Sequence, residues 1–204
     1  YHGATSRETF QEYGPRGGNG AFPKRKLSYP TGVKLWDWGR FPENDDQQGD
    51  HGVATWAVEQ LAEPQTKPFF LAIGFFRPHV PLYASEKWWN IIGPADDILL
   101  PQTLSSDNDD IVAFARKLTW SGLAPRHNWM VEHDQWKPAV HAYLACVSFV
   151  DHQVGRVLDA LDTSTHAENT IIVLWSDHGW ALGEKQRWAK RGLWEAETRV
   201  PLIV

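Results

Sequence analysis

Residues 170–180, TIIVLWSDHGW, form the stretch that decides the fold of this chain. An apolar run that is rich in β-branched residues and ends in Ser-Asp-His-Gly is typical of a buried strand, here 170–176, that leads into a turn. Ligands in open α/β sheets bind beyond the carboxyl ends of the strands. We therefore expect Asp177 and His178 to lie at a ligand site.

The segment before this strand, residues 138–161, has the clearest helical pattern in the chain. Val and Leu residues recur at intervals of three and four from Val140 to Leu161, and Pro138 suits a first helical turn. A helix followed by a strand forms a crossover unit, for which right-handed parallel pairing is the rule. A further helix is predicted over 51–62 by the same kind of spacing.

A second buried strand is predicted over residues 68–76, PFFLAIGFF, because the run is continuously apolar. It is followed by Arg-Pro-His-Val-Pro, in which Pro78 and Pro81 restrict the backbone around His79. We expect His79 to be held rigidly where this strand ends. Strands alternating with helices place the chain in the α/β class.

Two segments, 3–50 and 82–137, show little periodicity and are rich in turn-forming residues, so we expect long loops. A short helix at Lys87 and a helical turn or two over 111–118 are open alternatives. The chain has 12 Trp residues. An exposed subset would suit stacking on sugar rings. The alternative is that Trp56 and Trp175 belong to the core and the others pack their own loops.

Composition excludes several functional classes. The chain has 204 residues, 42% of them hydrophobic, which suffices for a core. A net charge of −5 argues against nucleic acid as a partner, and no apolar run is long enough to span a membrane. One cysteine, Cys146, excludes an intrachain disulfide, and its place within an apolar helix predicts a buried, inert thiol.

Four side chains are candidates for chemistry. Asp177 and His178 offer a carboxylate and an imidazole that suit a hard cation such as Ca²⁺ or Mg²⁺; the alternative is a turn capped by Asp177. Lys190, twelve residues beyond His178, could place a charge on phosphate or sulfate oxygens, or be an ordinary solvated lysine. His79 could instead be a packed histidine.

Several of these motifs together closely resemble type I sulfatases of the iduronate-2-sulfatase-like branch. The resemblance covers 68–81 and 138–204 well and the long loops hardly at all. The residues that carry it are 68–81, 143–156, SDHGWALGE at 176–184, WAK at 188–190 and TRVPLI at 198–203.

The resemblance implies an alkaline-phosphatase-like α/β sandwich, with a mainly parallel sheet flanked by helices, that hydrolyses sulfate esters. It implies one Ca²⁺, bound by Asp177 and His178, and a formylglycine nucleophile made from Cys or Ser in a Cys/Ser-x-Pro-x-Arg motif. Lys190 would contact the sulfate, and His79 would contact it or act as general acid. His2 would assist the formylglycine hydrate. Localisation would be extracytoplasmic: periplasmic, secreted or lysosomal.

The chain also departs from this family. It has no Cys/Ser-x-Pro-x-Arg motif and no N-terminal Asp pair to complete the calcium ligands. It begins at Tyr1 and ends in residues 200–204, VPLIV, within what resembles a strand. We therefore expect 1–204 to be an internal fragment, an incomplete catalytic domain that lacks the nucleophile and the C-terminal part. Alone, it should show no turnover and bind Ca²⁺ weakly.

Two other functions are compatible with the residues. Metal-dependent phosphoesterases of the same superfold share a strand-end Asp-His-Gly but use two metals and a Ser or Thr nucleophile; Lys190 makes a second cation partly redundant and favours sulfate. A non-catalytic carbohydrate-binding module would use the tryptophans. The expected substrate is a sulfated carbohydrate or another small sulfate ester.

Overall fold

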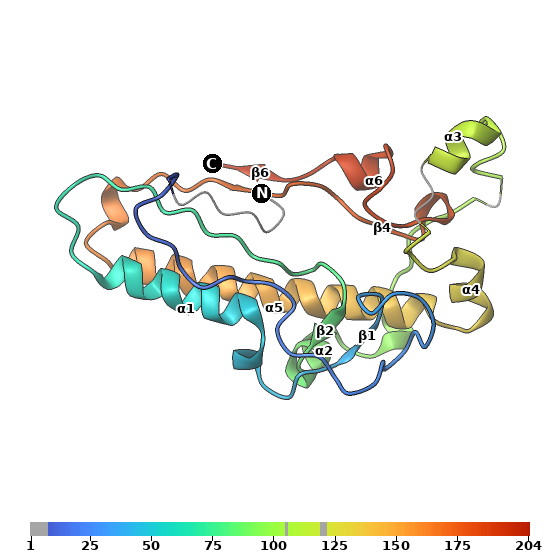
Figure 1. Ribbon diagram of the computed structural model, residues 1–204, viewed down its shortest axis with the longest axis horizontal. Coiled ribbons are helices and arrows are strands. Elements are labelled where there is room, and N and C mark those ends of the chain that lie inside the picture. Colours follow the sequence, from blue (N-terminus) through green and yellow to red (C-terminus); the bar gives the residue numbers. More distant parts are fainter. Residues whose placement is uncertain (1–7, 105, 119–121) are drawn as a thin grey trace.

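The computed structural model describes residues 8–104, 106–118 and 122–204. It is a mixed α/β structure in which two long helices run alongside a layer of extended chain (Figure 1). The helices are α1 (Gly49–Ala62), α2 (Glu86–Ile92), α3 (Ala113–Leu118), α4 (His127–Glu132), α5 (Trp136–Asp162) and α6 (Glu195–Thr198), with short 3-10 helices η1 (Asp45–Gln47), η2 (Ala95–Asp97), η3 (Ala167–Asn169) and η4 (Glu184–Gln186). The strands are β1 (Trp38–Arg40), β2 (Leu82–Ala84), β3 (Leu174–Trp175), β4 (Ala181–Leu182), β5 (Trp188–Ala189) and β6 (Leu202–Ile203).

Helix α5 is the element on which α1, α2, β1 and β2 pack. Small side chains on its inner face let these neighbours approach closely; its fully buried apolar residues are Ala139, Ala142, Ala145, Cys146 and Phe149. The helices predicted over 138–161 and 51–62 are confirmed as α5 and α1, with slightly wider bounds. Across the described ranges, no helix combines the length and apolar character that crossing a membrane requires.

Strands β1 and β2 form a parallel pair, with Trp38 opposite Leu82 and Arg40 opposite Ala84. They lie in the two segments predicted as long loops. That prediction is confirmed for most of 3–50, whereas 82–137 contains α2 and α3, close to the two helices left open at Lys87 and 111–118, and α4, which was not predicted. Trp36, Trp38, Trp88 and Trp89 from these segments are buried in the main core. These four tryptophans therefore serve packing, but in the main core and not within their own loops as the alternative had it.

Asp37 explains why such a Gly- and Pro-rich segment is ordered. Its carboxylate is fully buried and accepts hydrogen bonds from the backbone N–H groups of Leu27, Ser28 and Tyr29 at 2.7–2.9 Å. The hydroxyl of Tyr83 in β2 donates to the same carboxylate. The Asp37 carboxylate thus connects residues 27–29 to strand β2 of the parallel pair.

The strands predicted over 68–76 and 170–176 were mostly wrong. Within the described residues, 68–76 is extended but unpaired, and β3 pairs antiparallel with β6 where a parallel partner was expected. A buried parallel strand requires hydrogen-bonded neighbours and cover on both faces. Here the apolar side chains are exposed: Phe70 is 77% exposed, Ile171 83% and Trp175, a candidate core residue, 65%.

Candidate functional site

A tight turn after the 68–76 segment holds His79. Its backbone N–H donates to the carbonyl oxygen of Phe76 at 3.0 Å, and the Arg77–Pro78 and Val80–Pro81 peptides are both cis. The ring Nδ1 lies 2.8 Å from the carbonyl oxygen of Val80. Because a carbonyl can only accept, Nδ1 carries the proton and Nε2 is left as an acceptor.

The surroundings of His79 lower its pKa. Burial has the largest effect and lowers the pKa; the hydrogen bond to Val80 raises it by less, and the positive charges of Lys190 and His178 lower it further. Charge effects of this kind act over short distances. Lys190 and His178 therefore lie near enough to His79 to affect its charge, and the roles predicted for the three side chains stay predictions.

The buried side chain of Arg77 holds the turn around His79 in place. Its guanidinium donates to the carbonyl oxygens of His79, at 3.1 Å, and Pro81, and to the Gln48 side chain at 2.9 Å. Its backbone N–H donates to the buried carboxylate of Asp50 at 2.8 Å. Sequence reasoning missed Arg77, although a basic residue directly after an apolar run was a signal for such a role.

Asp177 and His178 lie on the chain that leaves β3. His178 Nδ1 lies 2.8 Å from the carbonyl oxygen of Gly179, so its Nε2 is again left unprotonated in the neutral ring. That Nε2 lies 3.5 Å from a carboxylate oxygen of Asp177, whose side chain is 81% exposed. The hydroxyl of Ser176 donates to the backbone carbonyl oxygen of His178 at 2.8 Å and braces the turn.

This pair fits a divalent cation as two of its ligands. Metal-binding histidines usually donate their other ring N–H to a carbonyl or carboxylate, as His178 does, and a carboxylate oxygen is a hard-cation ligand. Among the residues that the structure describes, no group of three or more His, Cys, Asp or Glu side chains is arranged to hold a metal. Asp177 and His178 could therefore supply two ligands of such an ion, and their role as metal ligands stays a prediction.

The β4–β5 hairpin returns the chain to this pair. Ala181 lies opposite Ala189, so Trp180 and Lys190 flank the same end of the hairpin. The indole N–H of Trp136 in α5 donates to the carbonyl oxygen of Leu182 at 2.7 Å and anchors the hairpin. The twelve residues between His178 and Lys190 are thus folded back, and the half-buried Lys190 reaches the region of His79.

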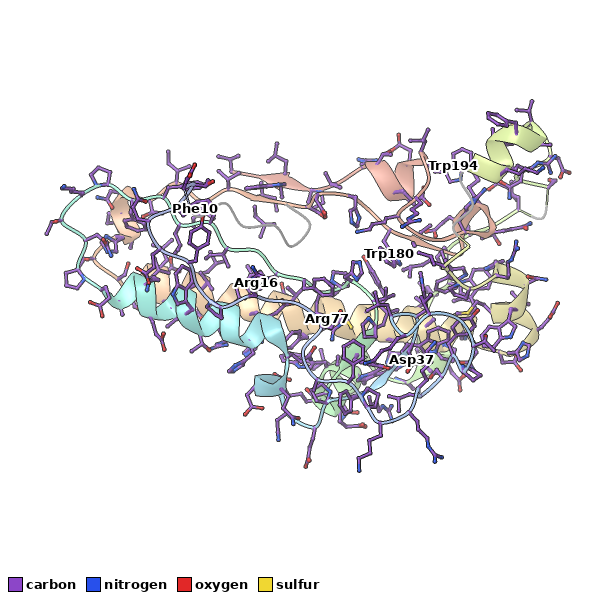
Figure 2. All side chains as sticks on the ribbon, viewed as in Figure 1. Phe10, Arg16, Asp37, Arg77, Trp180 and Trp194 are labelled. Atoms are coloured by element: carbon purple, nitrogen blue, oxygen red, sulfur yellow. The ribbon has the colours of Figure 1, made fainter. Side chains whose placement is uncertain are left out.

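Trp180 is a central residue that sequence reasoning did not single out (Figure 2). Its ring centroid lies 5.8 Å from that of His79, 6.3 Å from that of His178 and 5.9 Å from that of Trp36. Its Nε1 is buried, with no hydrogen-bond partner among the described residues. Its position directly after Asp-His-Gly was the available signal.

Two other candidates have different outcomes. His2 lies outside the described residues. Cys146 is fully buried in α5, and burial raises its pKa to about 11, so the prediction of an inert thiol is confirmed.

The chain matches the protein-family model described as Sulfatase over residues 5–204. It is 41% identical to a sulfatase of Formosa agariphila over 100% of this chain and 44% of that protein. It is 35% identical to mouse iduronate 2-sulfatase over 72% of this chain and 28% of that protein. The chain thus spans less than half the length of these relatives.

Solved structures of similar shape support the fold that the resemblance implied. A phosphonate monoester hydrolase of Agrobacterium radiobacter superimposes with a TM-score of 0.64 at 22% identity, over 81% of this chain and 35% of that one. A sulfatase structure from Bacteroides fragilis superimposes with a TM-score of 0.55 at 24% identity, over 77% of this chain and 30% of that one. The fold is therefore alkaline-phosphatase-like, as expected, and with the match over residues 5–204 the chain belongs to the sulfatase family.

Proposed function

We propose that this chain forms part of the catalytic domain of a sulfuric ester hydrolase that acts on a sulfated carbohydrate. The observation that carries the proposal is that the rings of His79 and His178 both lie near that of Trp180. Lys190 lies near enough to His79 to affect its charge, and Asp177 lies beside His178. Iduronate 2-sulfatase, one of the relatives, is named for a sugar sulfate, and this supports the carbohydrate class.

Lys190 and His79 are the proposed sulfate contacts. The ammonium group of Lys190 places a positive charge where the sulfuryl oxygens gain negative charge, which is usually the largest catalytic contribution. Free His79 is neutral, because burial lowers its pKa, and Nε2 is its unprotonated nitrogen. A bound sulfate adds negative charge beside the ring and favours protonation at Nε2, from which His79 can donate to the leaving oxygen.

Asp177 and His178 are the proposed ligands of one Ca²⁺, which would supply further positive charge at the sulfate. The proposed nucleophile is a formylglycine, and Cys146 is not its source, because its buried thiol lies within α5. No Cys/Ser-x-Pro-x-Arg motif occurs in these 204 residues. We therefore expect the 204 residues alone to give no turnover. The proposed role of His2 is to assist the nucleophile.

The proposed setting is extracytoplasmic, as the resemblance implies, with a glycan or small sulfate ester as substrate and no nucleic acid. The net charge of −5 supports the last point, since nucleic-acid sites need an excess of positive charge.

The test compares Lys190→Ala and His79→Ala in the natural gene product that contains these residues. Removing a preorganised charge or donor from the transition state should lower kcat/KM for a sulfated monosaccharide by roughly 10²–10³-fold. Lys67→Ala is the matched control, because Lys67 is exposed in the connection after α1. Hydrolysis of the phosphate monoester in preference to the sulfate ester would support the phosphoesterase alternative and contradict the proposal.

A further inference from the structure

A second concentration of positive charge lies beyond the candidate site. Helices α3 and α4 and the turn after β4 group together at one end of the molecule (Figure 1). Residues of these elements line a cavity of about 370 Å³, within the roughly 300–1,000 Å³ range of small-molecule sites. The basic residues that line it are Arg116, Arg126, Lys185, Arg187 and Arg191.

Carboxylates near this cavity offset part of its charge, and Glu184 acts on His127 and Glu197, which both line the cavity. Glu197 is the one carboxylate among the described lining residues, against five Lys and Arg side chains. Asp107, which is not a lining residue, forms an ion pair with Lys185 at 2.6 Å. This excess occurs in a chain whose net charge is −5, so it is a local feature of the cavity.

The basic side chains are positioned by the fold. The guanidinium of Arg187 donates to the backbone carbonyl oxygen of Arg116 at 2.9 Å and joins the hairpin to α3. Asn108 donates to the backbone carbonyl oxygen of Lys185 at 2.9 Å. A site whose charges are already held in place loses less entropy when an anion binds.

Two aromatic residues, His127 and Trp188, line the cavity next to these charges. The indole N–H of Trp188 lies 3.3 Å from Nδ1 of His127, and the ring of Trp136 packs edge-on against His127 at 4.4 Å between centroids. Of the two lining residues, Trp188 is only 5% exposed, so the half-buried ring of His127 is the flat surface beside the cations that suits a sugar ring with an acidic substituent.

The β4–β5 hairpin and the residues after it contribute to both the candidate sulfate site and the cavity. Lys190 belongs to the candidate sulfate site, and its neighbours Trp188 and Arg191 line the cavity. We infer that the cavity is a second anion subsite, which binds a sulfate or carboxylate group on a neighbouring part of the glycan whose sulfate ester lies at Lys190. This inference rests on the proposed function and narrows the substrate class to glycans with at least two acidic groups.

The test measures binding of three probes by intrinsic tryptophan fluorescence: a monosulfated disaccharide, the same disaccharide with a second sulfate, and the monosulfated form with a uronic acid carboxylate. The test variant is Arg126→Gln with Arg191→Gln, since both side chains are exposed and the fold should tolerate the change. The control is Lys67→Gln. Near-ultraviolet circular dichroism and the thermal midpoint check that each variant is folded.

The doubly acidic probes should bind the double variant roughly tenfold or more weakly, because each lost charge-assisted contact weakens binding severalfold, while the monosulfated probe changes by less than about twofold. A weakening confined to one doubly acidic probe assigns the subsite to sulfate or to carboxylate. Equal weakening of all three probes, or no weakening of either doubly acidic probe, would overturn the inference.

A separate variant tests the underlying function. Lys190→Ala should weaken all three probes, including the monosulfated one. If it leaves the monosulfated probe unaffected, the proposed function fails, whereas the difference between singly and doubly acidic probes in the arginine variant still decides the inference.

Discussion

Two regions of the molecule use the same residue type in opposite ways. The packed half, made of α1, α2, α5, β1 and β2, buries the carboxylates of Asp37 and Asp50 almost completely. The extended layer, made of 68–76, 170–180 and 200–204, leaves the side chain of Asp177 81% exposed. The layer also exposes a continuous apolar run, 171–175, whereas the exposed large apolar residues of the packed half, Ile91 and Val147, are isolated.

The difference in burial distinguishes carboxylates that order the chain from carboxylates that are available to a ligand. Each buried carboxylate accepts at least two backbone hydrogen bonds, so its oxygens are already used to order the chain. Asp177 contacts His178 and, among the described residues, holds no other segment in place. Acidic residues whose oxygens remain available are those that can bind a ligand.

The largest effect is expected for Asp37→Ala. The change leaves three backbone N–H groups and the Tyr83 hydroxyl without their acceptor, so the free energy of unfolding should fall by about 3 kcal/mol or more. Chemical denaturation followed by circular dichroism measures this. Asp46→Ala, at an exposed residue of η1, is the control and should stay within about 0.5 kcal/mol. A loss below 1 kcal/mol for Asp37→Ala would remove the distinction between the two regions.

The packed half was only partly predictable. The spacing of Val and Leu located α5, although the fully buried apolar residues of this helix are Ala, Cys and Phe, and Val147 is exposed. The role of Asp37 was not visible, because its partner Tyr83 is 46 residues away and no local pattern connects them. The apolar runs at 68–76 and 170–176 indicated burial, but strand pairing depends on neighbours that a run does not encode.

The candidate site could be named from motifs, whereas the sheet could not. Asp177, His178, Lys190 and His79 come from such motifs; the rings of His79 and His178 both lie near Trp180, and the chemical roles of all four stay predictions. Trp180, which contacts both histidines, was missed because a tryptophan in an apolar chain is first interpreted as core.

An intermediate effect concerns Cys146, in the packed half. With a pKa of about 11, roughly one thiol in a thousand is ionised at pH 8, against about one in ten at the ordinary value of 9.0. Native protein should thus react with iodoacetamide at least about 100-fold more slowly than urea-unfolded protein, as mass spectrometry can measure. Because the folded pKa is raised, this thiol's contribution to stability is complete below pH 9 and is lost as the pH rises through 11. Native alkylation within tenfold of the unfolded rate would show that the packed half opens readily.

The smallest change in stability is expected for Asp177→Asn, in the extended layer. Because the side chain is mostly exposed and orders no other segment, the free energy of unfolding without metal should change by less than about 0.5 kcal/mol. The substitution should nevertheless abolish stabilisation by Ca²⁺, which for the unsubstituted chain reaches about 1.4 kcal/mol at ten times the dissociation constant. Denaturation in CaCl₂ and in NaCl of equal ionic strength measures both quantities, with Asp46→Asn as the control. If Asp177→Asn destabilised the chain as much as Asp37→Ala, the exposed carboxylate would be structural after all. A small loss of stability combined with a complete loss of the calcium effect is the result that only a ligand-binding carboxylate can give.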